Sequence, residues 1–143
     1  MIGVLVVTHG RLAEELLAAA EHITGRLERF RALALDWSEG LEAANEKIRA
    51  EIGALDDGDG VLLLTDMFGD TPSNAALACC EEGRVEIVSG VNLPMMVRLA
   101  CTRQGSATLP EVARWLEIKG RQSIRRVSGG ERGPQAVGEP SGD

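Results

Sequence analysis

The hydrophobic positions of this chain follow two alternating patterns. Short continuous apolar runs, typical of buried strands, are followed by longer segments in which apolar residues recur every three or four positions, as on one face of a helix. This alternation predicts βαβ units and therefore an α/β fold with a mainly parallel sheet. The four predicted strands cover residues 2–8, 29–35, 60–65 and 85–89.

Five helices are predicted around these strands. The first two carry apolar stripes that should face the sheet: Leu12, Leu16, Ala20 and Ile23 in one, and Leu41, Ala44, Ile48 and Ile52 in the other. Two more begin at Thr71-Pro72 and at Asn92-Leu93-Pro94, where a capping side chain precedes a proline suited to the first turn. The fifth is expected from residue 110 to about 119, with Val112 and Leu116 buried.

The expected architecture is an open, mainly parallel four-stranded sheet in the order 2-1-3-4, flanked by helices on both faces. A chain of 143 residues and 15.2 kDa fits one domain, which we place at residues 1–128. Within it, the apolar residues 124–127 are a candidate edge strand, which could pair with a second subunit. Residues 129–143 hold five glycines and two prolines and almost nothing apolar, so we predict a disordered tail there.

The composition argues against several function classes. A net charge of -7 opposes binding to nucleic acid or to anionic membranes, and an aromatic content of 3% leaves few rings on which bases could stack. The three cysteines have neither the count nor the spacing of a disulfide framework or zinc site, which indicates a reducing compartment. With no secretion signal and no apolar segment of about 20 residues, a cytoplasmic protein without direct membrane insertion is expected.

The candidate chemistry lies at the ends of the first and third predicted strands. His9 ends the first apolar run, and Asp66 directly follows the third. If these strands are neighbours, both side chains lie at the switch point where open α/β sheets bind ligands. A carboxylate that accepts the proton of one imidazole nitrogen fixes the tautomer and leaves the other nitrogen with a free lone pair. His9 is therefore predicted to accept a phosphoryl group, with Asp66 as its orienting base.

Two further groups of residues complete the predicted site. Backbone N–H groups in the first turn of a helix favour an anion, so we expect phosphoryl binding by Gly10, Thr71, Ser73 and Asn74. The expected contacts with a protein partner are Met67, Phe68, Asn92, Leu93, Pro94 and Met95. The alternative for the apolar residues of 93–96 is that they pack under the sheet. No metal or other cofactor is required.

Three segments carry a resemblance to a known family. They are Val6-Val7-Thr8-His9-Gly10, residues 65–74 with the sequence TDMFGDTPSN, and residues 89–95 with the sequence SGVNLPM. In content, order and separation they resemble the mannose-type enzyme IIA components of the bacterial sugar phosphotransferase system, and the likeness extends over roughly residues 1–127.

This resemblance implies a phosphocarrier function. The phosphocarrier protein HPr would phosphorylate His9, and a IIB component would accept the group or the phosphorylated state would act as a regulatory signal. Asp66 would hydrogen-bond the ring nitrogen that is not phosphorylated, and Thr71 matches a Ser/Thr near the phosphoryl group. The resemblance also implies a homodimer that exchanges a C-terminal strand, for which residues 124–127 are the candidate.

One residue departs from the family pattern. Asp70 stands where family members commonly have a second glycine, and a carboxylate there tolerates positive φ less easily and would repel a phosphoryl group. We therefore expect either that the Asp70 side chain points to solvent or that phosphoryl transfer is slowed.

Three alternative functions remain open at this point. A phosphotransfer subunit of a dihydroxyacetone kinase system would use the same fold and a similar histidine. A non-enzymatic regulatory protein whose binding is switched by phosphorylation would share every residue of the site. A flavin- or nucleotide-binding module would suit the strand order, but the sequence contains neither a G-x-G-x-x-G nor a G-x-x-x-x-G-K-[ST] motif.

Overall fold

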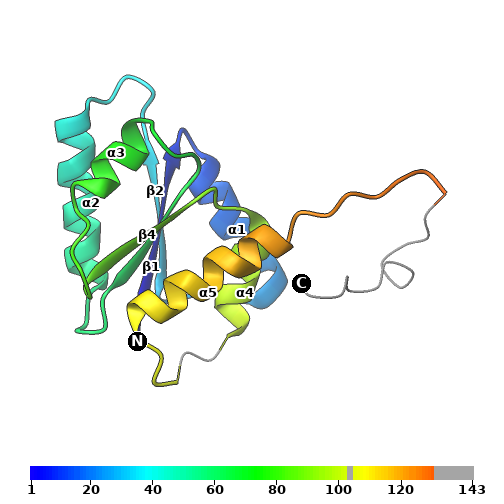
Figure 1. The fold of residues 1–143 in the computed structure, drawn as a ribbon. Helices are drawn as coiled ribbons and strands as arrows, with labels where there is room; N and C mark the ends of the chain where they lie inside the picture. Colours follow the sequence, from blue (N-terminus) through cyan, green and yellow to red (C-terminus); the bar gives the residue numbers. More distant parts are fainter. Residues whose placement is uncertain (103–104, 131–143) are drawn as a thin grey trace.

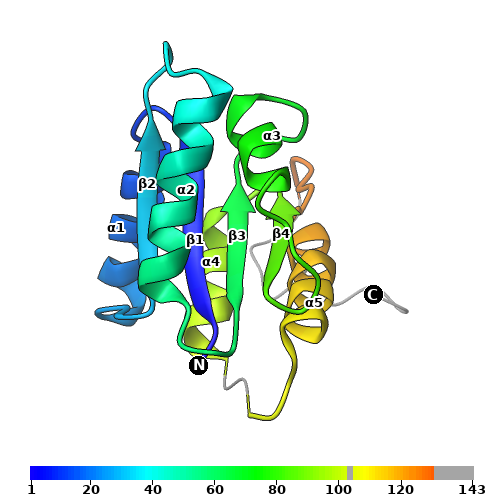
Figure 2. The same cartoon turned by 90° about the vertical axis from the view of Figure 1, so that its left-hand side faces the viewer.

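The structure is a computed structural model that describes residues 1–102 and 105–130. Its sheet consists of β1 (Gly3–His9), β2 (Phe30–Leu35), β3 (Val61–Thr65) and β4 (Val85–Ser89). The strands lie in the order β2-β1-β3-β4, and each neighbouring pair is parallel (Figure 2). The predicted α/β class, strand order and strand positions are confirmed, with strand boundaries that differ by at most one residue.

Five helices cover the two faces of the sheet (Figure 1). They are α1 (Leu12–Thr24), α2 (Leu41–Leu55), α3 (Thr71–Leu77), α4 (Leu93–Cys101) and α5 (Leu109–Gln122). One apolar cluster joins the sheet to α1, α4 and α5, and a second joins it to α2 and α3. The strands therefore contribute to a core on each side.

Successive residues of β1 show how a single strand serves both cores. Val4 and Val6 belong to the cluster under α1, α4 and α5, whereas Leu5 and Val7 belong to the cluster under α2 and α3. All four are at most 1% exposed. Side chains alternate between the two faces of a strand, so a strand that is buried on both faces must be apolar throughout. This explains why the strands appear as unbroken apolar runs in the sequence.

The predicted stripes of the first two helices are only partly correct. Leu12, Ile23 and Leu41 were expected to face the sheet, but they are 46%, 58% and 53% exposed. The completely buried residues of α1 are Ala13 and Ala20, and the partly buried Leu16 and Leu17 also pack against the core. Periodicity identified the helix, but an alanine face contributes little to a hydrophobic pattern.

The helix starts after β3 and β4 differ in their capping residues. Asn92 caps α4 as expected, because its side chain accepts a hydrogen bond from the N–H of Met95. Thr71 does not cap α3: the cap is Asp70, and Thr71 is the first helical residue. The fifth helix begins with a capping box formed by Thr108 and Glu111, and it runs slightly beyond its predicted bounds at both ends.

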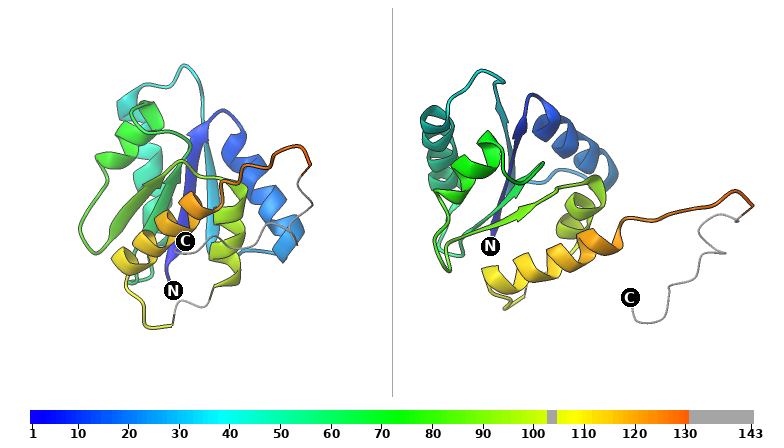
Figure 3. Two further views of the ribbon diagram at one scale, coloured as in Figure 1. Left: turned by 45° about the vertical axis from the view of Figure 1, so that its right-hand side comes forward. Right: turned by 45° about the horizontal axis from the view of Figure 1, so that its top comes forward.

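The C-terminal end of the described chain leaves the domain after α5 (Figure 3). Residues 124–127 do not form a strand in this single chain, and Ile124 and Val127 are 79% and 63% exposed. Of the predicted disordered tail, residues 131–143 lie outside the described residues. Within the described ranges, none of the helices has the length and apolar character needed to cross a membrane.

Candidate functional site

The carboxyl ends of β1 and β3 bring His9 and Asp66 together. The two strands are neighbours, and Val7 lies beside Thr65 in their register. His9 is the last residue of β1, and Asp66 is the residue after β3. The backbone N–H of His9 donates to Oδ2 of Asp66 over 3.1 Å, so the aspartate also fixes the backbone at the strand end.

The imidazole of His9 is hydrogen-bonded to the same carboxylate. Nδ1 of His9 lies 2.9 Å from Oδ2 of Asp66, and Oδ1 of Asp66 accepts from the N–H of Met67 at 3.0 Å. Because an ionised carboxylate can only accept, this contact assigns the ring hydrogen to Nδ1. Nε2 then carries a lone pair, and within the described chain it has no hydrogen-bond partner. The pairing expected from the sequence is therefore present in the structure.

Asp70 contacts the same ring nitrogen. Its Oδ2 lies 3.2 Å from Nδ1 of His9, and its side chain is only 13% exposed. The expectation that this side chain points to solvent is wrong, because it is held at the N-terminus of α3 as the helix cap. The backbone objection also fails: Asp70 has an extended conformation with φ of -110°, and the neighbouring Gly69 adopts the positive φ of 91°.

One of the residues predicted to bind an anion at the start of α3, Ser73, is already hydrogen-bonded within the loop. The N–H of Ser73 donates to Oδ1 of Asp70 at 2.9 Å, and the Ser73 hydroxyl accepts from the N–H of Gly69 at 3.0 Å. Ser73 is 4% exposed, so it is a buried part of the loop. Thr71 is half-buried and Asn74 is exposed, and the side chains of both are without hydrogen bonds to the described residues. Of this predicted group, these two side chains remain available.

Trp37 is a site residue that the sequence analysis missed. Its indole stacks on the imidazole of His9 with ring centroids 4.9 Å apart and an interplanar angle of 21°. Gly10 provides the necessary space: a Cβ there would lie 3.2 Å from Nε1 of Trp37, and the residue has a φ of 53°. Trp37 follows the end of β2, which lies beside β1, so the rule that directed attention to Asp66 could also have identified it.

The predicted partner-binding residues are divided between the surface and the core. Met67 and Phe68 are 56% and 78% exposed next to the site. In the first turn of α4, Leu93 is half-buried and Pro94 is exposed, whereas Met95 is buried. The alternative of packing under the sheet is correct for Met95 and for its neighbour Met96. Asn92, besides capping α4, donates to the hydroxyl of Ser123 just after α5.

The His9 imidazole and the two carboxylates beside it lie close enough together to hold a cation. The ligand atoms of His9, Asp66 and Asp70 lie within 4.8 Å of one another. Nδ1, however, is already hydrogen-bonded to Asp66 through the hydrogen that a metal would have to displace. The arrangement is that of a ring oriented by carboxylates, with its second nitrogen open.

Comparison with known proteins identifies the class as that of the phosphotransferase-system IIA components. The family model described as "PTS system fructose IIA component" matches residues 3–116. The chain belongs to this mannose-type EIIA family, as the resemblance of its motifs indicated. It is therefore related to components of a sugar phosphotransferase system, which supports a transferase role.

Individual relatives agree with this assignment. The chain is 32% identical over 127 residues to the mannose-specific EIIAB component of Escherichia coli; this match covers 88% of the chain but 39% of that relative. It is 30% identical to the fructose-specific EIIA component of Bacillus subtilis, with 90% and 88% of the two chains covered. The structure of a mannose/sorbose-specific IIA subunit from Enterococcus faecalis superposes with a TM-score of 0.78 at 26% identity, covering 89% of this chain and 95% of that subunit.

Proposed function

We propose that this protein is a phosphocarrier of the sugar phosphotransferase system that acts through a phosphohistidine at His9. HPr would donate the phosphoryl group. The group would then pass to a IIB component, or the phosphorylated protein would itself serve as a regulatory signal. The observation that carries this proposal is the hydrogen bond from Nδ1 of His9 to Asp66, because it leaves Nε2 as an open nucleophile at the sheet edge.

The transfer step can be written for these groups. The lone pair of Nε2 attacks phosphorus, the bond between phosphorus and its donor breaks, and the bonding electron pair leaves with the donor. The hydrogen on Nδ1 stays on the ring, and the positive charge that the imidazole develops is stabilised by the carboxylate of Asp66. The reverse sequence passes the group to an acceptor. The chemistry needs no metal or nucleotide.

The phosphoryl oxygens would be bound by groups near the start of α3. Thr71 offers a hydroxyl that has no partner among the described residues, and Asn74 offers a side-chain amide. We assign supporting roles to Ser73 and Gly10: Ser73 stabilises the loop by its bond to Gly69, and the N–H of Gly10 donates to the carbonyl of Leu35 at 2.9 Å. Phosphoryl binding thus depends chiefly on side chains that remain open in the unmodified protein.

The docking surface for HPr and the acceptor would surround His9. Exposed apolar side chains next to a partly exposed reactive group are typical of protein contact sites. Met67 and Phe68 are exposed directly after Asp66, Trp37 stacks on the imidazole, and the histidine side chain is 22% exposed. Leu93 and Pro94, in the first turn of α4, would extend the same surface, and Asn92 caps that turn. The buried Met95 anchors the turn in the core.

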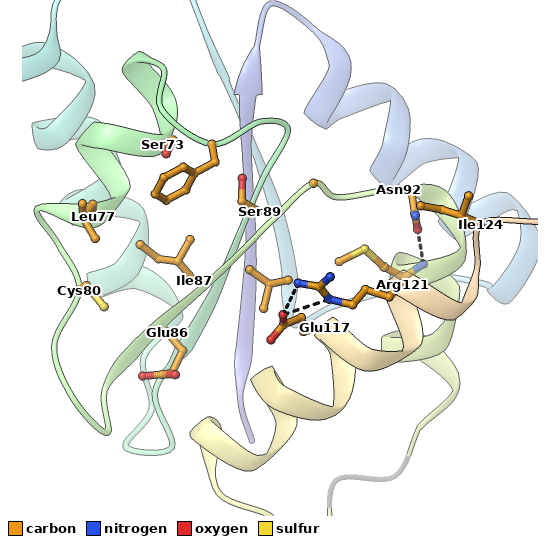
Figure 4. Close-up of a pocket in the computed structure, with 15 residues that line it drawn as sticks. Ser73, Leu77, Cys80, Glu86, Ile87, Ser89, Asn92, Glu117, Arg121 and Ile124 are labelled. Atoms are coloured by element: carbon orange, nitrogen blue, oxygen red, sulfur yellow. Dashed lines mark hydrogen bonds and ion pairs between the residues drawn. The ribbon is translucent and has the colours of Figure 1, made fainter. Parts of the chain in front are cut away.

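A homodimer is also part of this proposal. β4 is an edge strand, and a cavity of about 620 Å³ lies between it, α3 and α5 (Figure 4). Its apolar lining includes Phe68, Leu77, Ile87 and Ile124. An open strand edge presents unpaired backbone N–H and C=O groups with which another chain can pair. Residues 124–127 of a second copy would supply Ile124 and Val127 to this apolar surface, and an Ile124→Asp variant should shift the protein from dimer to monomer in light scattering.

The central test is incubation with phosphoenolpyruvate, enzyme I and HPr, followed by intact mass measurement and peptide mapping. We expect one acid-labile phosphoryl group on the peptide that contains His9, and none on a His9→Ala variant. The His22→Ala variant is the matched control, because His22 is exposed on α1, away from the carboxylates. Equal labelling of the His9→Ala variant would contradict the proposal. Loss of the label to a IIB protein, or its retention with altered binding of a regulator, separates transport from signalling.

A further inference from the structure

We propose that Asp70 is a second acceptor for the Nδ1 hydrogen of His9, so that two carboxylates share the task of orienting the phosphoryl-accepting ring. Its effect on transfer rests on the proposed function, whereas its effect on the ring tautomer does not. Asp70 acts as a positioning residue, because it contacts Nδ1 and not the reactive Nε2.

The geometry provides the first argument. Nδ1 of His9 has two carboxylate oxygens near it, at 2.9 Å from Asp66 and 3.2 Å from Asp70. Both carboxylates are held by backbone groups: Asp66 accepts from the N–H of Met67, and Asp70 accepts from the N–H of Ser73. Neither acid therefore needs a large movement to take the hydrogen, which can turn from one oxygen to the other by a small rotation of the ring.

The second argument is that Oδ2 of Asp70 has no competing partner. This oxygen is buried and accepts no hydrogen bond of standard geometry from the described residues. A buried carboxylate oxygen without a donor is costly, and Nδ1, which carries the ring hydrogen, lies 3.2 Å from it. Oδ2 of Asp66, in contrast, also accepts from the backbone N–H of His9. The free acceptor oxygen beside Nδ1 is therefore that of Asp70.

Electrostatics determines when the second carboxylate matters most. Two carboxylates near a neutral ring repel each other, and the attraction of each to the ring offsets that repulsion when the ring becomes positive. The imidazole gains positive charge as Nε2 bonds to phosphorus, so Asp70 stabilises the same charge as Asp66. The phosphoryl group forms on the opposite edge of the ring, farther from Asp70 than Nδ1 is, and its repulsion is weaker there.

A double-mutant cycle tests whether the acids replace one another. The variants are Asp66→Asn, Asp70→Ser and both together; serine is also a good helix cap, so α3 keeps its start while the charge near His9 is lost. If Asp70 is the second acceptor, the phosphorylation rate of the double variant falls about tenfold further than the product of the two single losses. A double variant whose rate loss equals the product of the two single losses would overturn the inference, as would a faster reaction in Asp70→Ser.

The ring tautomer gives a readout that does not depend on phosphorylation. The chain has two histidines, so ¹⁵N signals of His9 can be compared directly with those of the exposed His22. In Asp66→Asn, His9 should keep its hydrogen mainly on Nδ1, and in the double variant it should approach the tautomer pattern of His22. If Asp66→Asn alone gives the His22 pattern, Asp70 is not an acceptor.

The two measurements separate this inference from the proposed function. If the tautomer of His9 depends on both acids but HPr does not phosphorylate the protein, the role of Asp70 is supported and the phosphocarrier proposal is contradicted. If HPr phosphorylates His9 but neither the rates nor the tautomer depend on Asp70, the phosphocarrier proposal is supported and the role of Asp70 is contradicted. Circular dichroism of each variant shows that it is folded, and Asp70→Asn supplies a second uncharged side chain that can still cap α3 if the serine variant unfolds.

Discussion

The stack between Trp37 and His9 predicts that replacing the indole will slow phosphorylation without unfolding the protein. Trp37 is 78% exposed, and it covers one face of the imidazole at a centroid distance of 4.9 Å. The other constraints on the ring act at its Nδ1 edge, where the carboxylates lie. Without the indole, the ring keeps its hydrogen bond to Asp66 but can tilt about it, so Nε2 is less well oriented.

The size of the effect follows from the geometry. A stacked aromatic pair contributes about 0.5–1.5 kcal/mol beyond its buried area, and the lower half of that range applies here because Trp37 is mostly exposed. A loss of about 0.5–1 kcal/mol in orientation corresponds to a rate reduction of about two- to fivefold in Trp37→Ala. Trp37→Phe keeps a ring at this position and should lose less than twofold. The free energy of unfolding should change little in either variant.

The same residue supplies the assay. Trp115 is the second tryptophan and lies half-buried against the core, so a Trp115→Phe background leaves Trp37 as the sole source of indole fluorescence. Phosphorylation of His9 should alter its emission, and the time course gives the rate; for Trp37→Ala the rate is taken from quenched samples by mass. Emission that stays constant while mass spectrometry shows complete phosphorylation would refute the stacking argument, as would equal rates for Trp37→Ala and the parent.

Three other predictions concern stability and reactivity. In urea melts, Gly60→Ala should lower the free energy of unfolding by about 1–3 kcal/mol more than Gly58→Ala does. Both positions have positive φ, but only at Gly60 would the new Cβ meet a backbone oxygen, that of Arg84 at 2.8 Å. Equal losses of stability in the two variants would contradict this reasoning. The N–H of Gly58, and then the Arg84 guanidinium, hold the pKa of Asp56 below its usual range. The ionised carboxylate therefore contributes about 1–2 kcal/mol to the free energy of unfolding above about pH 4, and this contribution is lost as the pH falls through the lowered pKa of the folded state. In a pH series of urea melts, Asp56→Asn should lower stability at pH 7 but not at the acidic end. Burial raises the pKa of the Cys79 thiol, so iodoacetamide should modify Cys79 in the native protein far more slowly than after unfolding, and equal rates would contradict its burial.

The sheet could be predicted from the sequence because its strands are buried on both faces. Continuous apolar runs such as residues 61–64 have one physical explanation in a short α/β chain, and the helices between them impose parallel pairing. The faces of the helices were less predictable. In α1 the completely buried residues are Ala13 and Ala20, whose small side chains allow close packing but give a weak hydrophobic signal, whereas the larger Leu12 and Ile23 remain exposed.

The site was predictable where it depends on strand order. His9 and Asp66 each follow an apolar run that ends in a threonine, and adjacency of β1 and β3 is sufficient to bring them together. Trp37 was not predicted, because its contact depends on the path of the loop after β2 and on the missing side chain of Gly10. The pattern of residue types along the sequence predicts where strands end, but it does not predict the path of the loops that follow them.

Asp70 shows why a residue that departs from a family pattern needs a structure for its interpretation. Two objections were raised against a carboxylate at this position, one from backbone conformation and one from charge. The first disappears because Gly69 alone takes the positive φ, which leaves position 70 extended and open to any side chain. The second objection depends on direction: the hydrogen bond from the N–H of Ser73 holds the Asp70 carboxylate beside Nδ1, and not beside Nε2, where phosphorus would bind under the proposed function. The same charge that would hinder transfer from one side of the imidazole can assist it from the other.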